Sequence, residues 1–500
     1  MISEIKKKDW FKDRGYLHLT NRINLSERPK VFSYLTNSDK IARHKFSPFI
    51  FRTIKNRRYK FSKDLGRRSH KTIDENGDYI SNAKIRPIMY ATHIDSHIYS
   101  YYSKEIIQPL YEKELSKNDR LNESITAYRQ IVTLDGERFK FNVDFAKEGF
   151  DEIKLRGNCG VLAFDIKNFF PSLDHKKLKL IWASLLGCKT LPKDHYNIYK
   201  SITRFSYFYF DDLRQRKNGN LDEKQIAHLK NVGKFQLFES VKDFVNSDIQ
   251  VYKNQKKTNG KIAGIPQGLP ISAMLANLYM LPFDQLVIQE LVNDKGCYYR
   301  RYSDDLIIVC EESLVEEIAK FIHKAIEEIN LVIEPSKTER YIFKTEKEDL
   351  RCFKVADDNL VPNSYLLYLG FEFYGFKTLL KASNISEFYR EMKESIRIKR
   401  RRIDSAKIKY LTDNETLYKR KIYRLFTYRG RARYKRYLPA KRISHNGVKL
   451  TVVSTARRYR GNFIKYAYKA SDILNAPEIR RQVRRHNLIL KNYLHRNQLS

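Results

Sequence analysis

The feature that most constrains this chain is a pair of adjacent aspartates, Asp304 and Asp305, placed directly before an apolar run. The run 306–310 (LIIVC) is typical of a buried β-strand. Two neighbouring carboxylates at the mouth of such a strand repel each other, and partial burial raises that cost. A solvated turn is one explanation, because Asp side chains often bond nearby backbone groups in turns. The other explanation is a divalent cation that both carboxylates bind.

A second aspartate at the end of a strand favours the cation. Segment 160–166 (GVLAFDI) predicts a buried strand that carries Asp165, 139 positions before Asp304. Mg²⁺ takes oxygen ligands, usually one or two protein carboxylates together with substrate phosphates. Carboxylates from two strands can bridge a pair of ions that bind the attacking and leaving oxygens of an in-line displacement. Asp165, Asp304 and Asp305 therefore predict a two-metal nucleotidyltransferase.

The charge of the chain indicates a polyanionic partner. Its 500 residues include 96 Lys and Arg against 58 Asp and Glu, a net charge of +38. Residues 381–500 hold 33 basic and 8 acidic residues, so they contribute 33 − 8 = +25, and 417–471 contain no acidic residue. Such a basic segment favours nucleic acid binding. We expect a domain boundary near residue 380.

Cysteine spacing and hydropathy indicate the cellular compartment in which the protein is expected. The five cysteines show no C-x-x-C spacing, so neither a disulfide framework nor a zinc site is expected, and a reducing cytoplasm fits. The first residues contain no apolar signal segment, and no stretch approaches the roughly eighteen apolar residues of a membrane span. We expect a cytoplasmic protein without a membrane partner.

Hydrophobic periodicity predicts several further elements. Helices are expected over 174–186, over 269–291 with a break at Pro282, and over 313–331. The pattern from Ile85 to Tyr128 also looks helical.

Five segments resemble, in the right order, motifs A to E of a reverse transcriptase palm. They are 163–173 (AFDIKNFFPSL), 264–280 (GIPQGLPISAMLANLYM), 301–309 (RYSDDLIIV), 334–338 (EPSKT) and 368–373 (YLGFEF). Upstream, 84–106 (KIRPIMYATHIDSHIYSYYSKEI) and 127–129 (AYR) resemble the fingers of bacterial reverse transcriptases.

The resemblance implies an α+β right-hand polymerase. Residues 1–83 would form a basic N-terminal extension of the fingers. Residues 84–375 would form fingers and palm, with an antiparallel sheet and packed helices. Residues 376–500 would form a basic, α-helical, thumb-like RNA-binding domain.

The same resemblance implies the metal ligands. Asp165, Asp304 and Asp305 would be catalytic and would hold two Mg²⁺ ions, with Mn²⁺ as an alternative. The backbone carbonyl of Ile166 would be a further ligand. Lys337 would neutralise or protonate the leaving pyrophosphate.

Other residues would hold the nucleotide. Lys84 and Arg86 resemble the fingers cations that bind the triphosphate, and Gln267 lies in the loop near template and nucleotide. Phe170, five residues after Asp165, would pack under the ribose and exclude a 2′-hydroxyl. The alternatives are solvated surface charges for the cations and a core role for Phe170 like that of its neighbour Phe169.

The basic tail supplies the expected RNA contacts. They lie in 423–437 (YRLFTYRGRARYKRY), where tyrosines could stack on bases between cations: Arg429, Arg431, Arg433, Lys435 and Arg436.

Among reverse transcriptases, the chain most resembles the abortive-infection and defence-associated bacterial enzymes, type 9 of the latter included. The maturase region of group II intron enzymes and the V-T-G segment of retron enzymes are not recognised. The resemblance implies antiphage defence, a dedicated non-coding RNA, dNTP substrates, a cDNA product and a homo-oligomer. Template-independent DNA synthesis, an RNA polymerase and a non-catalytic RNA-binding scaffold remain alternatives.

Two other patterns resemble sites. Asp211 and Asp212 precede RQRKNGN rather than an apolar strand, which predicts a surface turn. His93 and His97 have a spacing that can bind zinc, but without an evident third ligand a structural helix face is expected.

Overall fold

The computed structural model describes residues 9–57, 59–62, 64–74, 77–214, 223–255, 257–258, 260–334, 338–356, 359–410, 419–428, 436–444, 447–455 and 461–497. The chain forms two compact units. The first comprises 1–130, 164–308 and 316–338, and the second comprises 131–163, 309–315 and 339–500. The boundaries expected at 83/84 and 375/376 stay a prediction.

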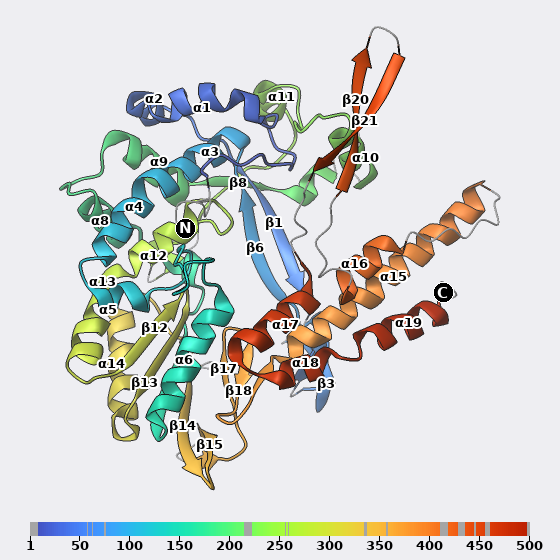
Figure 1. Ribbon diagram of the computed structural model, residues 1–500. Coiled ribbons are helices and arrows are strands. Elements are labelled where there is room, and N and C mark those ends of the chain that lie inside the picture. The colour runs from blue at the N-terminus through green and yellow to red at the C-terminus, as the bar shows by residue number, and fades with distance from the viewer. Residues whose placement is uncertain are drawn as a thin grey trace. The chain divides into compact units, whose positions relative to one another are not determined.

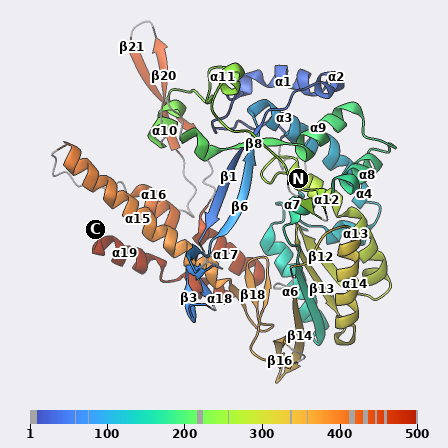
Figure 2. The ribbon, with the colours of Figure 1, turned by 180° about the vertical axis from the view of Figure 1, so that it is seen from behind.

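The first unit contains a four-stranded sheet in the order β6-β1-β8-β9. Strand β1 (Phe49–Asn56) pairs antiparallel with β6 (Lys84–Tyr90) and parallel with β8 (Ser206–Tyr209), and β9 is Tyr252–Lys253. Figures 1 and 2 show β1 and β6 side by side, with helix α3 (His93–Tyr101) near one end of the pair.

The helical pattern expected from residue 85 onward is wrong for β6. Arg86 precedes Pro87, and the residue before a proline is disfavoured in helical conformation. The β-branched Ile85 and Ile88 also favour an extended chain. The helices begin only at α3 and continue with α4 (Gln108–Leu115) and α5 (Asp119–Ser124).

Helix α3 carries the two histidines with metal-like spacing, and both are buried. The Nε2 atom of His93 lies 3.1 Å from the Tyr16 carbonyl oxygen, and the His97 ring stacks on Phe11 with centroids 4.6 Å apart. Burial lowers the pKa of His93 to about 4 and that of His97 to about 3. The two side chains therefore serve packing, as expected.

The elements predicted around the aspartates are present. A six-stranded sheet has the order β12-β13-β7-β14-β15-β16, and its strands β7 and β13 each contain residues of both units. The strands are β12 (Tyr298–Tyr302), β13 (Asp305–Cys310), β7 (Cys159–Asp165), β14 (Glu339–Glu346), β15 (Asp349–Ala356) and β16 (Asn359–Val361). The apolar runs of β7 and β13 are buried, which confirms their prediction as core strands.

The expected helices are also confirmed. They are α8 (His175–Leu185), α12 (Ser272–Tyr279), α13 (Leu281–Val287) and α14 (Val315–Glu328), to which the structure adds α9 (Lys193–Thr203). Pro282 lies in the first turn of α13, directly after the break at Met280, where its missing N–H costs nothing.

The second unit contains helix α6 (Asn142–Arg156) and the small sheet β17 (Leu366–Tyr368), β18 (Phe371–Phe373) and β19 (Thr378–Leu380). The long helix α15 (Ala382–Tyr410) contacts α16 (Arg420–Phe426) and α19 (His486–Arg496) (Figure 1). Helices α17 (Phe463–Leu474) and α18 (Pro477–Val483) pack against each other.

A purely α-helical tail is not observed. Strand β20 (Arg436–Ser444) pairs antiparallel with β21 (Gly447–Thr455). The sequence GVKLTVVST of β21 is rich in β-branched residues, which favour an extended chain. Local β-propensity therefore overrides the helical expectation here.

Two further observations concern the described ranges. None of their helices combines the length and the apolar character needed to cross a lipid bilayer. Of the five cysteines, four are buried and Cys188 is exposed.

Candidate active site

A backbone hydrogen bond joins the two chain segments that carry Asp165 and Asp304. Asp165 ends β7, and Asp304 lies in the turn between β12 and β13. The Ile166 N–H donates a hydrogen bond to the Asp304 carbonyl oxygen, with N···O 3.1 Å. Asp305 begins β13, and all three aspartate residues are partly exposed. The structure therefore brings together the two chain segments that the sequence paired.

A third segment is attached to the same place. The Lys167 N–H donates to the Val332 carbonyl oxygen at 2.8 Å, and the Glu334 N–H donates to the Asp165 carbonyl oxygen at 2.8 Å. Glu334 is three residues before Lys337, which lies outside the described residues. The role of Lys337 stays a prediction, although the segment leading to it lies beside Asp165.

The loop that starts at Gly264 is bonded to the turn after Asp165. The Ile265 N–H donates to the Phe170 carbonyl oxygen at 2.9 Å, and the Gly264 N–H donates to the Leu173 carbonyl oxygen at 2.8 Å. Gly264 has φ +85°, and a Cβ atom there would lie 2.5 Å from the Pro171 carbonyl oxygen. Only glycine allows this close approach.

The two phenylalanines of that turn differ in burial. Phe169 is 3% exposed and belongs to the core, whereas Phe170 is partly exposed. This difference agrees with a core role for Phe169 and leaves Phe170 available to a ligand. The sugar-gate role of Phe170 stays a prediction.

The same loop contacts the fingers strand β6. The Met89 N–H donates to the Gln267 carbonyl oxygen at 2.8 Å. A cavity of about 180 Å³ lies between β1, β6 and this loop, and its lining includes Phe51, Pro171 and Gln267. Gln267 therefore shares this cavity with Pro171 of the turn that carries Phe170, and its contact with template or nucleotide stays a prediction.

The two predicted fingers cations lie at the other end of β6 from Met89. Lys84 pairs with Asn56 of β1 and is partly exposed, and Arg86 pairs with Ile54 and is exposed. Their binding to a triphosphate stays a prediction.

Tyr128 belongs to the segment 127–129 that resembles the fingers, but its contact with this site was not predicted. Its hydroxyl lies 3.0 Å from Oγ of Ser303. Ser303 is the residue immediately before Asp304 and Asp305 in the sequence. Burial raises the pKa of Tyr128, and the carboxylates of Asp304 and Asp305 add to that shift. A contact between residues 175 positions apart leaves no local signal.

A buried ion pair beneath the turn was also missed. Arg301 Nη2 lies 2.6 Å from Asp284 Oδ2, and both side chains are fully buried. Arg301 Nη1 donates to the Ser303 carbonyl oxygen at 3.2 Å, and the Tyr299 hydroxyl donates to Asp284 at 2.8 Å. Ser303 has φ +65°, a conformation that is uncommon for residues other than glycine.

Each member of this pair affects the protonation of the other. Burial raises the pKa of Asp284, and the guanidinium of Arg301 opposes that shift. Burial alone would lower the pKa of Arg301, but the charge of Asp284 raises it overall. A charged residue at a buried strand position was the sequence signal for this network.

The donor set fits a divalent cation that completes its shell from outside the protein. Within the described ranges, no group of three His, Cys, Asp or Glu side chains is arranged to hold a metal ion. The three aspartates nevertheless offer carboxylate oxygens, and Ile166 offers a carbonyl oxygen, at one hydrogen-bonded junction. Mg²⁺ accepts such a set, because it usually keeps several waters and takes further ligands from substrate phosphates.

The remaining site predictions fall elsewhere. Asp211 lies in the 3₁₀ turn η4 (Phe210–Arg214) and is exposed, consistent with the expected surface turn. The predicted RNA contacts Arg429, Arg431, Arg433 and Lys435 lie outside the described residues. Arg436 begins β20, and its side chain is not among those described.

Comparison with known families bears directly on this site. Residues 223–373 match the family model described as reverse transcriptase (RNA-dependent DNA polymerase). The chain carries a reverse transcriptase domain. The matched range includes Gln267, Asp304 and Asp305, and it begins after Asp165.

Individual relatives are distant. The telomerase reverse transcriptase of Takifugu rubripes is 22% identical over 201 residues, which cover 35% of this chain and 18% of the relative. This chain therefore spans less than a fifth of that curated relative.

Telomerases are among the solved structures with some likeness to this chain. Apo telomerase from Candida tropicalis, truncated from the C-terminal domain, has a TM-score of 0.35 at 10% identity, over 71% of this chain and 60% of that chain. Telomerase from Candida albicans, in complex with a TWJ fragment of telomeric RNA, has a TM-score of 0.35 at 11% identity, over 93% and 66%.

Proposed function

We propose that this chain is an RNA-directed DNA polymerase that extends a 3′-hydroxyl with dNTPs. The observation that carries the proposal is the Ile166–Asp304 backbone hydrogen bond, which joins the two predicted carboxylate segments. The reverse transcriptase match over 223–373 supports it. The test is incorporation of labelled dNTPs by the purified chain, with an RNA template and Mg²⁺.

The residues have distinct tasks in this proposal. Asp165, Asp304 and Asp305, with the Ile166 carbonyl, would hold two Mg²⁺ or Mn²⁺ ions, which when bound supply positive charge to the transferring phosphate. The loop with Gln267 positions the base pair. Tyr128 and Arg301 hold the Ser303 backbone and side chain, so that the turn keeps the two aspartates in place.

The finer proposal concerns template and purpose. We propose that the template is a dedicated non-coding RNA, that the cDNA serves antiphage defence, and that the protein resembles type 9 of the defence-associated enzymes and forms homo-oligomers. The acid-free segment 417–471 and the motif resemblance support this. Sequencing the nucleic acid that co-purifies with the protein, with and without ribonuclease treatment, tests it.

The alternatives give different results in the same assay. Template-independent synthesis by the same palm would continue after removal of all RNA. A non-catalytic RNA-binding scaffold would retain RNA and incorporate nothing at any metal concentration.

Phe170→Ala is expected to admit ribonucleotides while retaining part of the activity on dNTPs. A ring under the ribose leaves no room for a 2′-hydroxyl, and alanine removes the overlap. Single-nucleotide incorporation with matched dNTP and rNTP measures the preference. A wild-type protein that prefers rNTPs would contradict the reverse transcriptase assignment itself.

Phe169→Ala is the matched control for that change. Because Phe169 is 3% exposed, its truncation should lower the free energy of unfolding by about 3–5 kcal/mol through a core cavity. The sugar preference should stay that of the wild type.

Reversing the charge at Arg429, Arg431 and Arg433 is expected to weaken RNA binding and to flatten its salt dependence. Each phosphate contact that is lost lowers the slope of log affinity against log salt by about 0.7 to 0.9. Titration of an RNA hairpin at several salt concentrations measures the slope. An unchanged affinity and slope would reassign these arginines to packing or an oligomer contact.

A further inference from the structure

The fingers sheet has a second face with its own cavity. Adjacent residues of a strand point to opposite faces of a sheet. Phe51 lines the small cavity beside Gln267, so its neighbours Ile50 and Arg52 lie on the other face. Tyr90 of β6 pairs directly with Ile50 and therefore shares that face.

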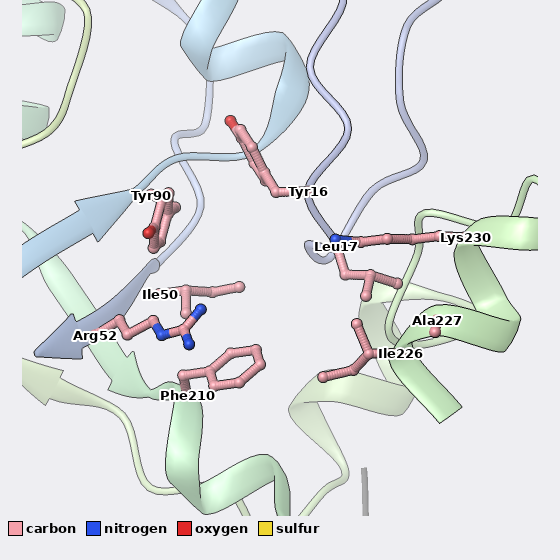
Figure 3. A pocket seen from close by; sticks show the side chains of 9 residues that line it. All are labelled: Tyr16, Leu17, Ile50, Arg52, Tyr90, Phe210, Ile226, Ala227 and Lys230. Atoms are coloured by element: carbon pink, nitrogen blue, oxygen red, sulfur yellow. The ribbon is translucent and has the colours of Figure 1, made fainter. Parts of the chain in front are cut away.

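The cavity on this face has a volume of about 390 Å³. Figure 3 shows it between the strands, the N-terminal segment with Tyr16 and Leu17, Phe210 of η4, and helix α10 (Glu223–Asn231). We name it the fingers cavity. Its size falls within the range of roughly 300–1,000 Å³ that is usual for small-molecule sites.

The floor of the fingers cavity is apolar and belongs to the core. Ile50 and Leu17 are buried, and Ile50 belongs to a core cluster against which Tyr90 and Phe210 pack. The rings of Tyr16 and Tyr90 have centroids 5.6 Å apart. The cavity thus presents aromatic surfaces that a flat ligand can stack on.

Two cations extend over this apolar lining. Figure 3 shows the guanidinium of Arg52 directed into the cavity and the side chain of Lys230 reaching from α10 toward Leu17. The Arg52 guanidinium carbon lies 5.2 Å from the centroid of the Phe210 ring. Arg52 and Lys230 are exposed. No ion pair joins either of them to a carboxylate of the residues that the structure describes.

We propose that the fingers cavity binds one unpaired nucleotide, with its base on the aromatic rings and its phosphate on Arg52 and Lys230. Aromatic side chains stack on any base, and cations bind the phosphate by charge-assisted hydrogen bonds. The apolar floor disfavours inorganic phosphate alone, and the two uncompensated cations disfavour a neutral aromatic ligand. The nucleotide can be free or part of an RNA strand, since both present the same chemistry. This site is separate from the palm aspartates, none of which lines it.

The test measures binding in EDTA, so that no metal supports a nucleotide at the palm. Adenosine 5′-monophosphate, adenosine, ribose 5-phosphate and an octamer of adenosine nucleotides are titrated into the full chain by calorimetry. The variant Arg52→Gln/Lys230→Gln is compared with Arg43→Gln/Lys193→Gln, which removes the same charge from exposed positions elsewhere in the first unit. Phe210→Leu removes only an aromatic ring, and it replaces the double variant in this test if the double variant does not fold.

The expected result is that the monophosphate binds the wild type and the control equally, and the Arg52→Gln/Lys230→Gln protein about tenfold or more weakly. Phe210→Leu should also weaken it, by roughly tenfold. Adenosine and ribose 5-phosphate should each bind the wild type more weakly than the monophosphate. Asp165→Asn should leave monophosphate binding unchanged.

The octamer separates the two sources of the nucleotide. If the double variant weakens the octamer as well, the site holds a nucleotide of an RNA strand. If the octamer binds the double variant as it binds the control, the site holds a free nucleotide. Equal binding of both ligands by the double variant and the control, or no monophosphate binding by the wild type, would overturn the proposal.

Discussion

Asp304→Asn is expected to lower dNTP incorporation by roughly a hundredfold or more while leaving the protein folded. The amide keeps the shape of the side chain but removes the charge that a divalent ion requires, so the transferring phosphate loses its electrostatic stabilisation. Asp165→Asn should have the same effect, because its strand end lies beside Asp304 through the Ile166 hydrogen bond. Primer extension with matched thermal melting measures both properties.

Asp211→Asn is the matched control. Asp211 also begins an Asp-Asp pair after aromatic residues, but it lies exposed in η4 rather than at the junction with Asp165. Its change should leave incorporation near the wild-type level. An inactive Asp211→Asn protein beside an active Asp304→Asn protein would show that the wrong pair had been chosen.

The strands that carry the aspartates could be predicted because their signals are local. The runs 160–166 and 306–310 are short, apolar and bounded by polar residues, and both are core strands. The junction between Asp165 and Asp304 was predicted because two-metal chemistry requires carboxylates from separate strands. The requirements of two-metal chemistry thus predicted a long-range contact that hydrophobic periodicity alone cannot predict.

The elements that prediction missed depend on pairing or on side-chain contacts between distant residues. Segment 84–90 pairs with β1, and its apolar pattern resembles that of the helices that follow, although Pro87 disfavours a helix there. The second strand of the hairpin β20–β21 is rich in β-branched residues, but the charge of the tail led to the helical prediction. Tyr128 contacts Ser303 across 175 positions.

The Arg301–Asp284 pair shows why a charge belongs in the strand before the aspartates. A hydrophobic residue at position 301 would pack as well, but it could not donate a hydrogen bond to the Ser303 carbonyl oxygen. Thr126 binds the Arg301 backbone, since its N–H and its hydroxyl both donate to the Arg301 carbonyl oxygen at 3.0 Å. The network therefore fixes β12 and the turn from two sides.

Arg301→Ala is expected to lower the free energy of unfolding by about 3–5 kcal/mol, because it leaves the buried Asp284 without its cation. Urea denaturation followed by circular dichroism measures the loss. The paired change Arg301→Met/Asp284→Leu removes both charges and fills a similar volume, so it should recover most of that stability. Lys295→Ala with Glu317→Ala is a control, because that ion pair is solvent-exposed and its removal should leave the free energy of unfolding close to that of the wild type.

Measurement of dNTP incorporation separates the contribution of the Arg301–Asp284 pair to stability from its contribution to the position of the Ser303 backbone. The Arg301→Met/Asp284→Leu protein should be stable but should incorporate dNTPs more slowly than the wild type, because nothing replaces the hydrogen bond from Arg301 Nη1 to the Ser303 carbonyl oxygen. Without that bond, the φ of +65° at Ser303 loses part of its support, and Asp304 is held less firmly. A paired variant with full stability and full activity would reduce the network to core packing. An Arg301→Ala protein as stable as the wild type would contradict the burial of the pair itself.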